Sequence, residues 1–396
     1  MDEKSKKLIK KHNMSIGEDR ISDLPNVILD NILSFLDMKY VVATCILSTR
    51  WKDVWKSVPH LDFSDNPRCI NSIDKVLLSR DLTSNIERFS FISNQRWESS
   101  RVRSWISTVA RYKLRELVLT FVGDQLILPP SLFCLESLTV LRITSCGAVK
   151  LTSPICFPRL KIFDLQFFEF CDGYITENFS NCPLLEELVI TNCWWDNTLK
   201  NISISNPLLK RLILRSWEDQ DHNFDIININ APSLVYLSWE SEYLPIECNL
   251  SAMPSLASAF VTFQQFYVDR PMNKIGCAAC MLLRALCHVK SLTISAQGYK
   301  PYRIKEELNW ESDTVPQTWL SHLKKVEYCE FDGHPLEIAL IKYLLENATA
   351  LEEIIIQVWK GGNDIIEFLE KFLEMPRSSD KCAIRLRWSD VRGIID

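Results

Sequence analysis

An internal repeat is the feature that most constrains how this chain of 396 residues can fold. The pattern Leu-x-x-Leu-x-Leu, with other apolar residues in place of some leucines, occurs eleven times. Between Leu114 and Leu256 the repeats begin 22 to 25 residues apart, and the later intervals are 33, 34 and 28 residues. The pattern begins at Ile86, Leu114, Leu138, Leu160, Leu185, Leu209, Leu234, Leu256, Val289, Leu323 and Leu351.

The regular intervals have the length of leucine-rich repeats, and the longer ones indicate insertions. Each unit is expected to contain one strand, in which alternate side chains face a common core. A single unit cannot bury its own apolar side, so the units must stack around one continuous core. The pattern predicts an α/β solenoid. In the unit at 183–193, Leu185, Leu188 and Ile190 are expected to face inward, and Glu187, Val189 and Thr191 outward.

Two further positions recur in the repeat. A proline precedes the first leucine of five units by two residues, where its fixed φ is expected to end the previous segment. These are Pro158, Pro183, Pro207, Pro232 and Pro254. The Asn/Cys position of the repeat holds Cys146, Phe168, Cys193, Trp217 and Phe331, which we expect to pack at the turn after the strand.

The N-terminal stretch has helical periodicity instead. Asp23-Leu24-Pro25 suits the start of a helix whose apolar residues, Ile28, Leu29, Ile32, Leu33 and Leu36, are predicted to form one stripe. A second helix is expected over Lys39–Leu47, and Ser48 is expected to cap a third that carries Trp51 and Trp55. Three helices in about 45 residues make a small core, which favours either docking to a partner or capping of the solenoid.

Two amphipathic helices, over Pro335–Asn347 and Asp364–Met375, are predicted beside the last repeat strand.

Composition narrows the class of protein. The formal charge of −5 is scattered along the chain, which argues against nucleic-acid binding. No apolar run is long enough for a membrane span, and the basic N-terminus is unlike a signal peptide. We therefore expect a cytoplasmic or nuclear protein, or one present in both, whose fourteen cysteines are mostly packed thiols. The cluster Lys4–Lys11 is either a nuclear import signal or part of a solvated tail.

No catalytic or cofactor motif is present, such as GxSxG, HExxH or a phosphate-binding glycine loop. Cys277, Cys280, Cys287 and His288 suggest a zinc site, but a second pair at the usual spacing is missing, so a helix packed on the core is preferred. The six histidines show no pairing in sequence. The expectation is a protein that is not an enzyme, with no metal and no cofactor. Trp194, Trp195 and Trp217 are either binding anchors or space-filling residues.

Two segments are specific enough to indicate a family. The stretch DRISDLPNVILDNILSFL, followed by LSTRWKDVWKSVPHLDF, closely resembles the F-box of plant F-box/leucine-rich-repeat proteins. The stretch from Val315 to Gln357, with EKFLEMPRSSDKCAIRL after it, resembles the FBD domain that accompanies this F-box. The resemblance implies a disordered basic tail at 1–18, a three-helix F-box at 19–63, leucine-rich repeats at 64–310 and an FBD domain at 311–390 that continues the solenoid.

The resemblance also implies a function. F-box proteins dock onto a Skp-type adaptor, which attaches them to a cullin and RING scaffold as the substrate receptors of SCF ubiquitin ligases. The chain departs from the family at Asp37-Met38-Lys39-Tyr40, although Asp37 is still expected to cap the second helix. The positions that match the family's docking residues are Leu24, Pro25, Ile28, Leu29, Ile32, Leu36, Leu47, Arg50, Trp51 and Trp55.

A target protein is expected to bind the exposed strand face. The mixed charges there favour a polar protein surface over a polyanion or a nucleic acid. Three alternatives remain open: a small-molecule-sensing co-receptor, which would need a basic pocket, a hydrolase with a Cys/His site, and a scaffold that no longer binds the adaptor. The outward candidates are Glu116, Arg142, Asp164, Gln166, Glu187, Arg211, Arg215, Tyr236, Glu240 and Lys325.

Overall fold

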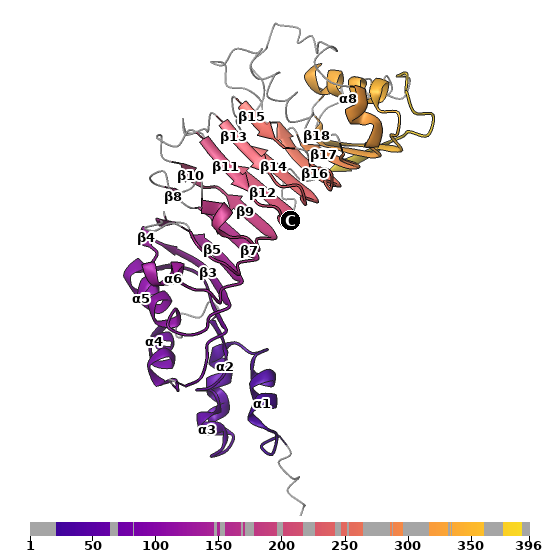
Figure 1. The fold of residues 1–396 in the computed structure, drawn as a ribbon. Coiled ribbons are helices and arrows are strands. Elements are labelled where there is room, and N and C mark those ends of the chain that lie inside the picture. The colour runs from indigo at the N-terminus through magenta and orange to yellow at the C-terminus, as the bar shows by residue number, and fades with distance from the viewer. Residues whose placement is uncertain are drawn as a thin grey trace, which may run out of the picture.

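A long curved β-sheet runs through the computed structural model, with helices at both ends and along its convex side (Figure 1). The fold is α/β, and the helices within the described residues are few and short. Within the described ranges no helix has both the length and the apolar character to cross a membrane. The structure describes residues 21–63, 70–81, 83–145, 149–150, 155–167, 169–170, 178–195, 201–216, 226–241, 247–251, 253–263, 286, 288–295, 317–331, 333, 335–359 and 375–389.

In the part of the chain that the structure describes, the large sheet has thirteen strands that follow one another in chain order, and neighbouring strands are parallel. After every strand the chain therefore crosses back to the end of the sheet at which that strand began. The strands are β1 (His60–Phe63), β2 (Arg88–Trp97), β3 (Glu116–Gly123), β5 (Val140–Ser145), β7 (Ile162–Gln166), β9 (Glu187–Thr191), β12 (Arg211–Ser216), β14 (Tyr236–Ser241), β16 (Ser258–Phe263), β17 (Ser291–Ser295), β18 (Lys325–Phe331), β19 (Glu353–Trp359) and β20 (Ala383–Ser389).

Each of the eleven repeat starts lies two residues before a strand of this sheet, from β2 to β19. All eleven side chains are buried, with at most 2% of their surface exposed. The predicted register of the repeat is thereby confirmed. The sheet also contains β1 and β20, which the repeat pattern did not predict.

The strands align so that one apolar row crosses the sheet. Leu117 on β3 pairs with Leu141, Leu141 with Phe163, and the row continues strand by strand to Ile354 on β19. Every member from Leu117 to Ile354 is buried. We call this side of the sheet the inner face, and the side that carries the alternate residues the outer face.

Two residues that face outward as predicted are nevertheless buried. Val189 and Thr191 lie on the outer face of β9 as expected, but only 9% and 8% of their surfaces are exposed. Val189 lies between Asp164 and Ile213 on the neighbouring strands, and Thr191 lies between Gln166 and Arg215. Strands about 4.8 Å apart allow such larger neighbours to cover a short branched side chain.

The residues at the two ends of a strand recur at fixed positions in the repeat. Phe167, Asn192 and Glu330 have φ values of 60°, 51° and 57°, and each is the seventh residue after a repeat start. This left-handed residue precedes the Asn/Cys position, where Cys193 and Phe331 are buried as predicted. Cys146, Phe168 and Trp217 lie outside the described residues. The five prolines lie at exposed positions ahead of the strands.

The convex side carries a second layer, which closes the core. Near the N-terminus it consists of α4 (Ile70–Ser79), α5 (Ser99–Val109) and α6 (Pro130–Phe133). Trp105 of α5 packs edge-on against Phe91 and Trp97 of β2. Two small parallel sheets continue the layer: β4 (Leu126–Ile127), β6 (Val149–Lys150), β8 (Glu169–Phe170) and β10 (Trp194–Trp195), then β11 (Asn201–Ser205), β13 (Ile226–Asn230) and β15 (Glu247–Leu250).

Further along the chain, short 3-10 helices η3 (Asn178–Asn181) and η5 (Gln317–His322) precede β9 and β18. Helix α8 (Pro335–Asn347) has the bounds that were predicted from the sequence. In the second predicted helix, Asp364–Met375, only Met375 lies among the described residues.

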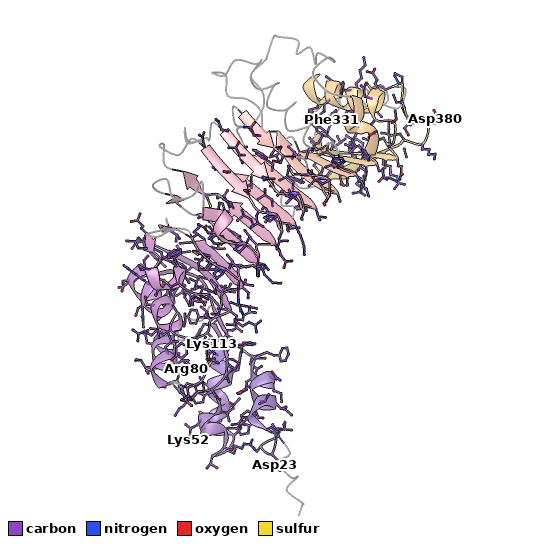
Figure 2. The ribbon with its side chains drawn as sticks, viewed as in Figure 1. Asp23, Lys52, Arg80, Lys113, Phe331 and Asp380 are labelled. Carbon is purple, nitrogen blue, oxygen red and sulfur yellow. The ribbon has the colours of Figure 1, made fainter. Side chains whose placement is uncertain are left out.

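The N-terminal end consists of α1 (Asn26–Leu33), α2 (Met38–Ala43), the 3-10 helix η1 (Thr44–Ile46) and α3 (Trp51–Val54). Helix α2 packs on β1 through the buried Met38 and Val41. Figure 2 shows Asp23 of this region and Asp380 at opposite ends of the molecule. The small helical region therefore covers one end of the long sheet.

A buried arginine links the two parts. Arg80, which directly follows α4, donates hydrogen bonds to the carbonyl oxygens of Val58 at 2.7 Å and Asn85 at 3.1 Å. Arg80 also attracts Asp30 of α1, although burial of that carboxyl outweighs the attraction and raises the pKa of Asp30. Figure 2 shows Arg80 where the helices meet the sheet.

Candidate functional site

The apolar stripe of helix α1 is partly buried and partly exposed. Leu29 and Leu33 are completely or almost completely buried against the core. Ile28 and Ile32, four residues apart, are each 44% exposed. Residues at these spacings fall on one broad side of a helix, as predicted, but only the Leu29 and Leu33 edge of this stripe faces the core, whereas the Ile28 and Ile32 edge faces solvent. A helix that is apolar on its exposed side has surface available for a partner.

The exposed side of α1 belongs to a larger apolar surface. Among the residues that the structure describes, sixteen large hydrophobic side chains are exposed, and nine of them fall between positions 21 and 47. Such concentration in a short segment distinguishes this surface from scattered exposed apolar residues. The docking surface, as we name it, consists of Ile21, Val27, Ile28, Ile32, Phe35, Leu36, Tyr40, Ile46 and Leu47.

Four members of the docking surface were among the predicted adaptor contacts: Ile28, Ile32, Leu36 and Leu47. Phe35 and Ile46, which are 88% and 84% exposed, were not predicted from the sequence. Phe35 lies beyond the last turn of α1, and Ile46 lies in a 3-10 helix. Neither position belongs to a regular α-helical stripe, and their only signal in the sequence is an apolar residue outside the predicted core.

Other predicted contacts support the surface from beneath. Leu29 and Trp51 are buried and so do not lie on it, which corrects their assignment. Leu24 and Trp55 are partly buried and pack against the core, whereas Pro25 is exposed and precedes α1. Arg50 donates hydrogen bonds to the carbonyl oxygens of Ser22 and Leu24, and the Trp51 Nε1 donates to Ser22 Oγ at 2.9 Å. These bonds hold the segment before α1 against α3.

The family departure at Asp37 leaves the helix cap intact. The Asp37 carboxylate accepts a hydrogen bond from the backbone N–H of Lys39 at 2.8 Å, which confirms its predicted role as N-cap of α2. Tyr40, the last residue of the stretch that departs from the family, is 57% exposed and contributes to the docking surface.

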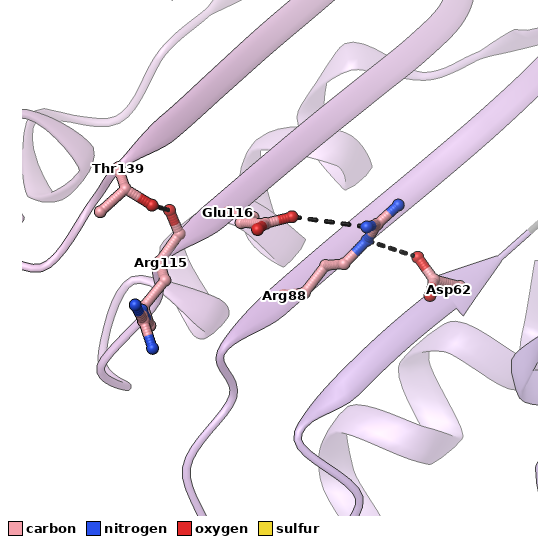
Figure 3. Close-up of polar contacts among 5 residues, drawn as sticks. All are labelled: Asp62, Arg88, Arg115, Glu116 and Thr139. Atoms are coloured by element: carbon pink, nitrogen blue, oxygen red, sulfur yellow. Dashed lines mark hydrogen bonds and ion pairs between the residues drawn. The ribbon is translucent and has the colours of Figure 1, made fainter. Parts of the chain in front are cut away.

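The outer face of the large sheet brings together the residues predicted to bind a target. Ion pairs connect neighbouring strands along this face. Arg88 on β2 lies between Asp62 on β1, at 3.1 Å, and Glu116 on β3, at 3.4 Å (Figure 3). Further pairs between strands are Arg142 with Asp164, Glu187 with Arg211, and Lys325 with Glu353. Lys325 also pairs with Glu327 on its own strand. Opposite charges on adjacent strands stabilise the sheet.

The three candidate arginines are all engaged. Arg142 is 4.0 Å from Asp164, and Gln166 donates to Asp164 at 3.4 Å. Arg211 lies over the ring of Tyr236, at 4.4 Å from its centre. Burial raises the pKa of Asp164, because desolvation of the carboxylate outweighs the attraction of Arg142.

Glu240 does not fit its predicted role. Only 8% of this residue is exposed, and its carboxylate accepts hydrogen bonds from Arg215 at 2.7 Å and Ser238 at 2.8 Å. Because both partners lie on the same face, Glu240 fixes Arg215 in place and is not available to a target.

Cys182, Cys193, Cys329 and Cys382 are buried packing residues, whereas Cys134 and Cys156 are exposed. Burial raises the pKa of Cys182 to about 11 and that of Cys329 to about 12, so both thiols are protonated near neutral pH. Within the described ranges, no three His, Cys, Asp or Glu side chains converge as metal ligands. Cys277, Cys280 and Cys287 lie outside those ranges, as do Lys4–Lys11, and nothing is described of the Trp194, Trp195 and Trp217 side chains.

The structure does pair two histidines that are far apart in sequence. The rings of His288 and His322 lie 5.6 Å apart, centre to centre. Each precedes the first inward residue of its unit, Val289 or Leu323, so stacking of the units brings them together. His322 Nδ1 also lies 3.1 Å from Ser321 Oγ.

Family models match three segments of the chain. An F-box domain model matches residues 21–63, and an FBD model matches 311–356. A model of the leucine-rich repeats of the FBD-associated F-box protein At5g56370 matches residues 102–259. The first match contains the docking surface, and the third contains the outer-face pairs Arg142–Asp164, Arg211–Glu187 and Arg215–Glu240.

Similar proteins from Arabidopsis thaliana cover the chain more widely. The F-box/LRR-repeat protein At3g26922 is 31% identical over 71% of this chain and 90% of its own length. The F-box/FBD/LRR-repeat protein At4g00160 is 33% identical over 59% of this chain and 54% of its own length. The FBD-associated F-box protein At4g10400 is 26% identical over 91% of this chain and 97% of its own length.

Proposed function

This chain belongs to the plant family of F-box proteins with leucine-rich repeats and an FBD domain, and we propose that it is a substrate receptor of an SCF-type ubiquitin ligase. F-box domains generally bind Skp-type adaptors within SCF complexes. In this proposal the helices of residues 19–63 bind the adaptor, and the repeats of 64–310, with the FBD region of 311–390, hold a target protein.

The docking surface is the observation that carries the proposal. Nine exposed apolar side chains between positions 21 and 47 are costly for a chain that remains alone in water. Phe35 and Ile46 are the most exposed members, so a partner that covers them removes more exposed apolar surface per side chain than at any other position of the docking surface. The buried residues beneath, Leu29 and Trp51, and the Arg50 hydrogen bonds give the surface a fixed shape before binding.

The proposed mechanism is tethering. The chain would hold the adaptor at one end and a target on the outer face, so the target's effective concentration near the ligase rises. Ubiquitin transfer itself would be performed by other subunits. The raised pKa values of Cys182 and Cys329 support a non-catalytic role, since neither thiol is a ready nucleophile.

Two alternative functions fit the structure less well. A co-receptor for an anionic small molecule needs arginines free to bind it, but Arg142, Arg211 and Arg215 are each paired with a carboxylate. A scaffold without adaptor binding would have no use for the exposed apolar side chains of the docking surface.

The test is a titration of the full chain with a purified Skp-type adaptor, measured by calorimetry. The double variant Phe35→Asp/Ile46→Asp is expected to bind about 100-fold more weakly than the wild type, because two central anchors become charged. Its thermal unfolding midpoint should stay close to that of the wild type, since both side chains are already exposed.

Leu78→Asp is the matched control. Leu78 is 85% exposed on α4, outside the docking surface, so this variant should bind as the wild type does. A folded wild-type chain that does not bind the adaptor would refute the proposal in favour of a scaffold. Unchanged affinity of the double variant would refute the docking surface as drawn here.

A further inference from the structure

The first and last strands of the large sheet differ in what covers their outer edges. At the first strand, β1, helix α2 packs against the sheet. At the last strand, β20, one edge pairs with β19, and no strand among the described residues pairs with the other. An uncovered strand edge exposes unpaired backbone donors and acceptors, which can bind another chain.

The hydrogen-bond pattern identifies which backbone groups are unpaired. The N–H of Ala383 donates to the carbonyl oxygen of Glu352 at 2.9 Å, so residue 383 points toward β19. Successive residues of a strand point to alternate sides. The backbone groups of Ile384, Leu386 and Trp388 therefore point to the free edge.

The side chains of β20 also alternate. Ile384 and Leu386 lie on the inner face, partly buried against the core, and Trp388 on the same face is 47% exposed. Arg385 and Arg387 lie on the outer face, with 67% and 57% of their side chains exposed. The free edge thus presents an apolar row on one side and a cationic row on the other.

Arg88 shows that a cation on an interior strand of this sheet can pair with carboxylates on both sides. Its guanidinium has a carboxylate on each neighbouring strand, Asp62 and Glu116 (Figure 3). Arg385 has a carboxylate on one side only, Glu353 of β19 at 3.1 Å. Arg387 also reaches inward, to Glu327 of β18 at 3.2 Å. A fourteenth strand that continued the charge pattern of the sheet would carry acidic residues beside these arginines.

We propose that the free edge of β20 binds an extended segment of a partner protein in which acidic residues alternate with apolar ones. The segment's backbone pairs with the groups of Ile384, Leu386 and Trp388. Its apolar side chains cover the exposed Trp388 at the end of the core, and its acidic side chains complete the surroundings of Arg385 and Arg387. Strand addition of this kind combines backbone affinity with side-chain specificity. The proposal is independent of adaptor docking.

A second copy of the chain is a poor occupant of this edge. Two β20 strands that paired with each other would place their arginine rows on adjacent strands. Like charges directly opposite each other destabilise a strand pair. The charge of the edge therefore favours a different, acidic chain.

The first experiment titrates the full chain with labelled synthetic peptides and follows fluorescence anisotropy. The probe is the blocked peptide Thr-Glu-Val-Glu-Leu-Glu-Val-Thr, and its control has lysine in place of each glutamate. The glutamate peptide is expected to bind about tenfold more tightly, since two cross-strand charge pairs change sign between the peptides. Equal affinity for the two peptides would overturn the proposal.

N-methylated forms of the glutamate peptide test strand pairing directly. Methylation of alternate amides blocks one edge of an extended peptide and leaves the other intact. One of the two methylation patterns should abolish binding and the other should preserve it. Similar binding of both forms would show that the peptide does not add as a strand, and the proposal would fall.

A double variant, Arg385→Gln/Arg387→Gln, tests the charge. It should lose most of the preference for glutamate over lysine while it keeps its unfolding midpoint within a few degrees. Arg88→Gln is the matched control, because Arg88 lies on the same face but inside the sheet, and the preference should persist there. A dimer of the chain that competes with the peptide, detected by sedimentation, would identify a second copy as the occupant and refute the proposal.

Discussion

Asp164 occupies a crowded place on the outer face, where only 20% of its side chain is exposed. Burial raises its pKa, and the Glu187 carboxylate on the next strand acts in the same direction. The charged form is therefore less favourable in the folded chain than in the unfolded one. This loss of stability is complete at a pH above the folded-state pKa and disappears as the pH falls toward the ordinary value of 3.8.

Asp164→Asn should consequently be more stable than the wild type at pH 7. The difference should shrink as the pH is lowered through the raised pKa, because the wild-type carboxyl then becomes neutral as well. Urea unfolding of both proteins at pH 7, 5 and 4 measures it. A gap that widens toward low pH would mean that Arg142 stabilises the carboxylate more than burial opposes it.

Single residues also show where prediction from sequence stops. The inward residues were predictable because they recur at fixed offsets from each repeat start, as Leu185, Leu188 and Ile190 do. The burial of Val189 and Glu240 was not predictable. It depends on which side chains lie opposite on the neighbouring strands, and the units that supply those strands differ in length.

At the scale of whole elements, strand β20 was not predicted from the sequence because its residues depart from the spacing of the repeat. In the other units the first inward residue precedes the next by three positions, as Leu351 precedes Ile354. Before β20, the buried Cys382 precedes Ile384 by two, so the pattern is broken although the strand still pairs in register with β19. Strand β1 has the usual spacing at Val58, Leu61 and Phe63, but it lies within the segment assigned to the F-box.

The junction between the helical region and the sheet depends on Arg80. Removal of this side chain would leave the carbonyl oxygens of Val58 and Asn85 without their donor and Asp30 without its attracting charge. Arg80→Ala is expected to reduce the free energy of unfolding by about 3 kcal/mol, as expected for two buried hydrogen bonds to a charged group. Urea unfolding measures the loss.

Arg103→Ala is a suitable control for that experiment, because Arg103 is exposed on α5. It should change the free energy of unfolding by less than about 0.5 kcal/mol. If Arg80→Ala proved equally mild, apolar packing of buried residues such as Met38, Val41 and Val58 would have to hold the junction without it.

Across the whole molecule, the sheet should be protected unevenly against hydrogen exchange. In β14 every residue pairs with either β12 or β16, so consecutive amides should be protected alike. In β20 the amides of Arg385 and Arg387 should exchange about 100-fold more slowly than those of Leu386 and Trp388, which point to the free edge. Exchange resolved to single residues by NMR measures this. Equal protection along β20 would mean that its outer edge is covered.

Because the strands follow one another in chain order, the position of a strand in the sequence sets its distance from the N-terminal helices. Thirteen strands spaced about 4.8 Å apart span roughly 55 to 60 Å from β1 to β20. Arg80 attaches the first strand to the helical region. The strand that a target contacts therefore sets the distance between the target and the partner bound to that region. Insertion or loss of one repeat unit would move every later surface by about 4.8 Å and leave its chemistry unchanged. Reach could then evolve separately from recognition.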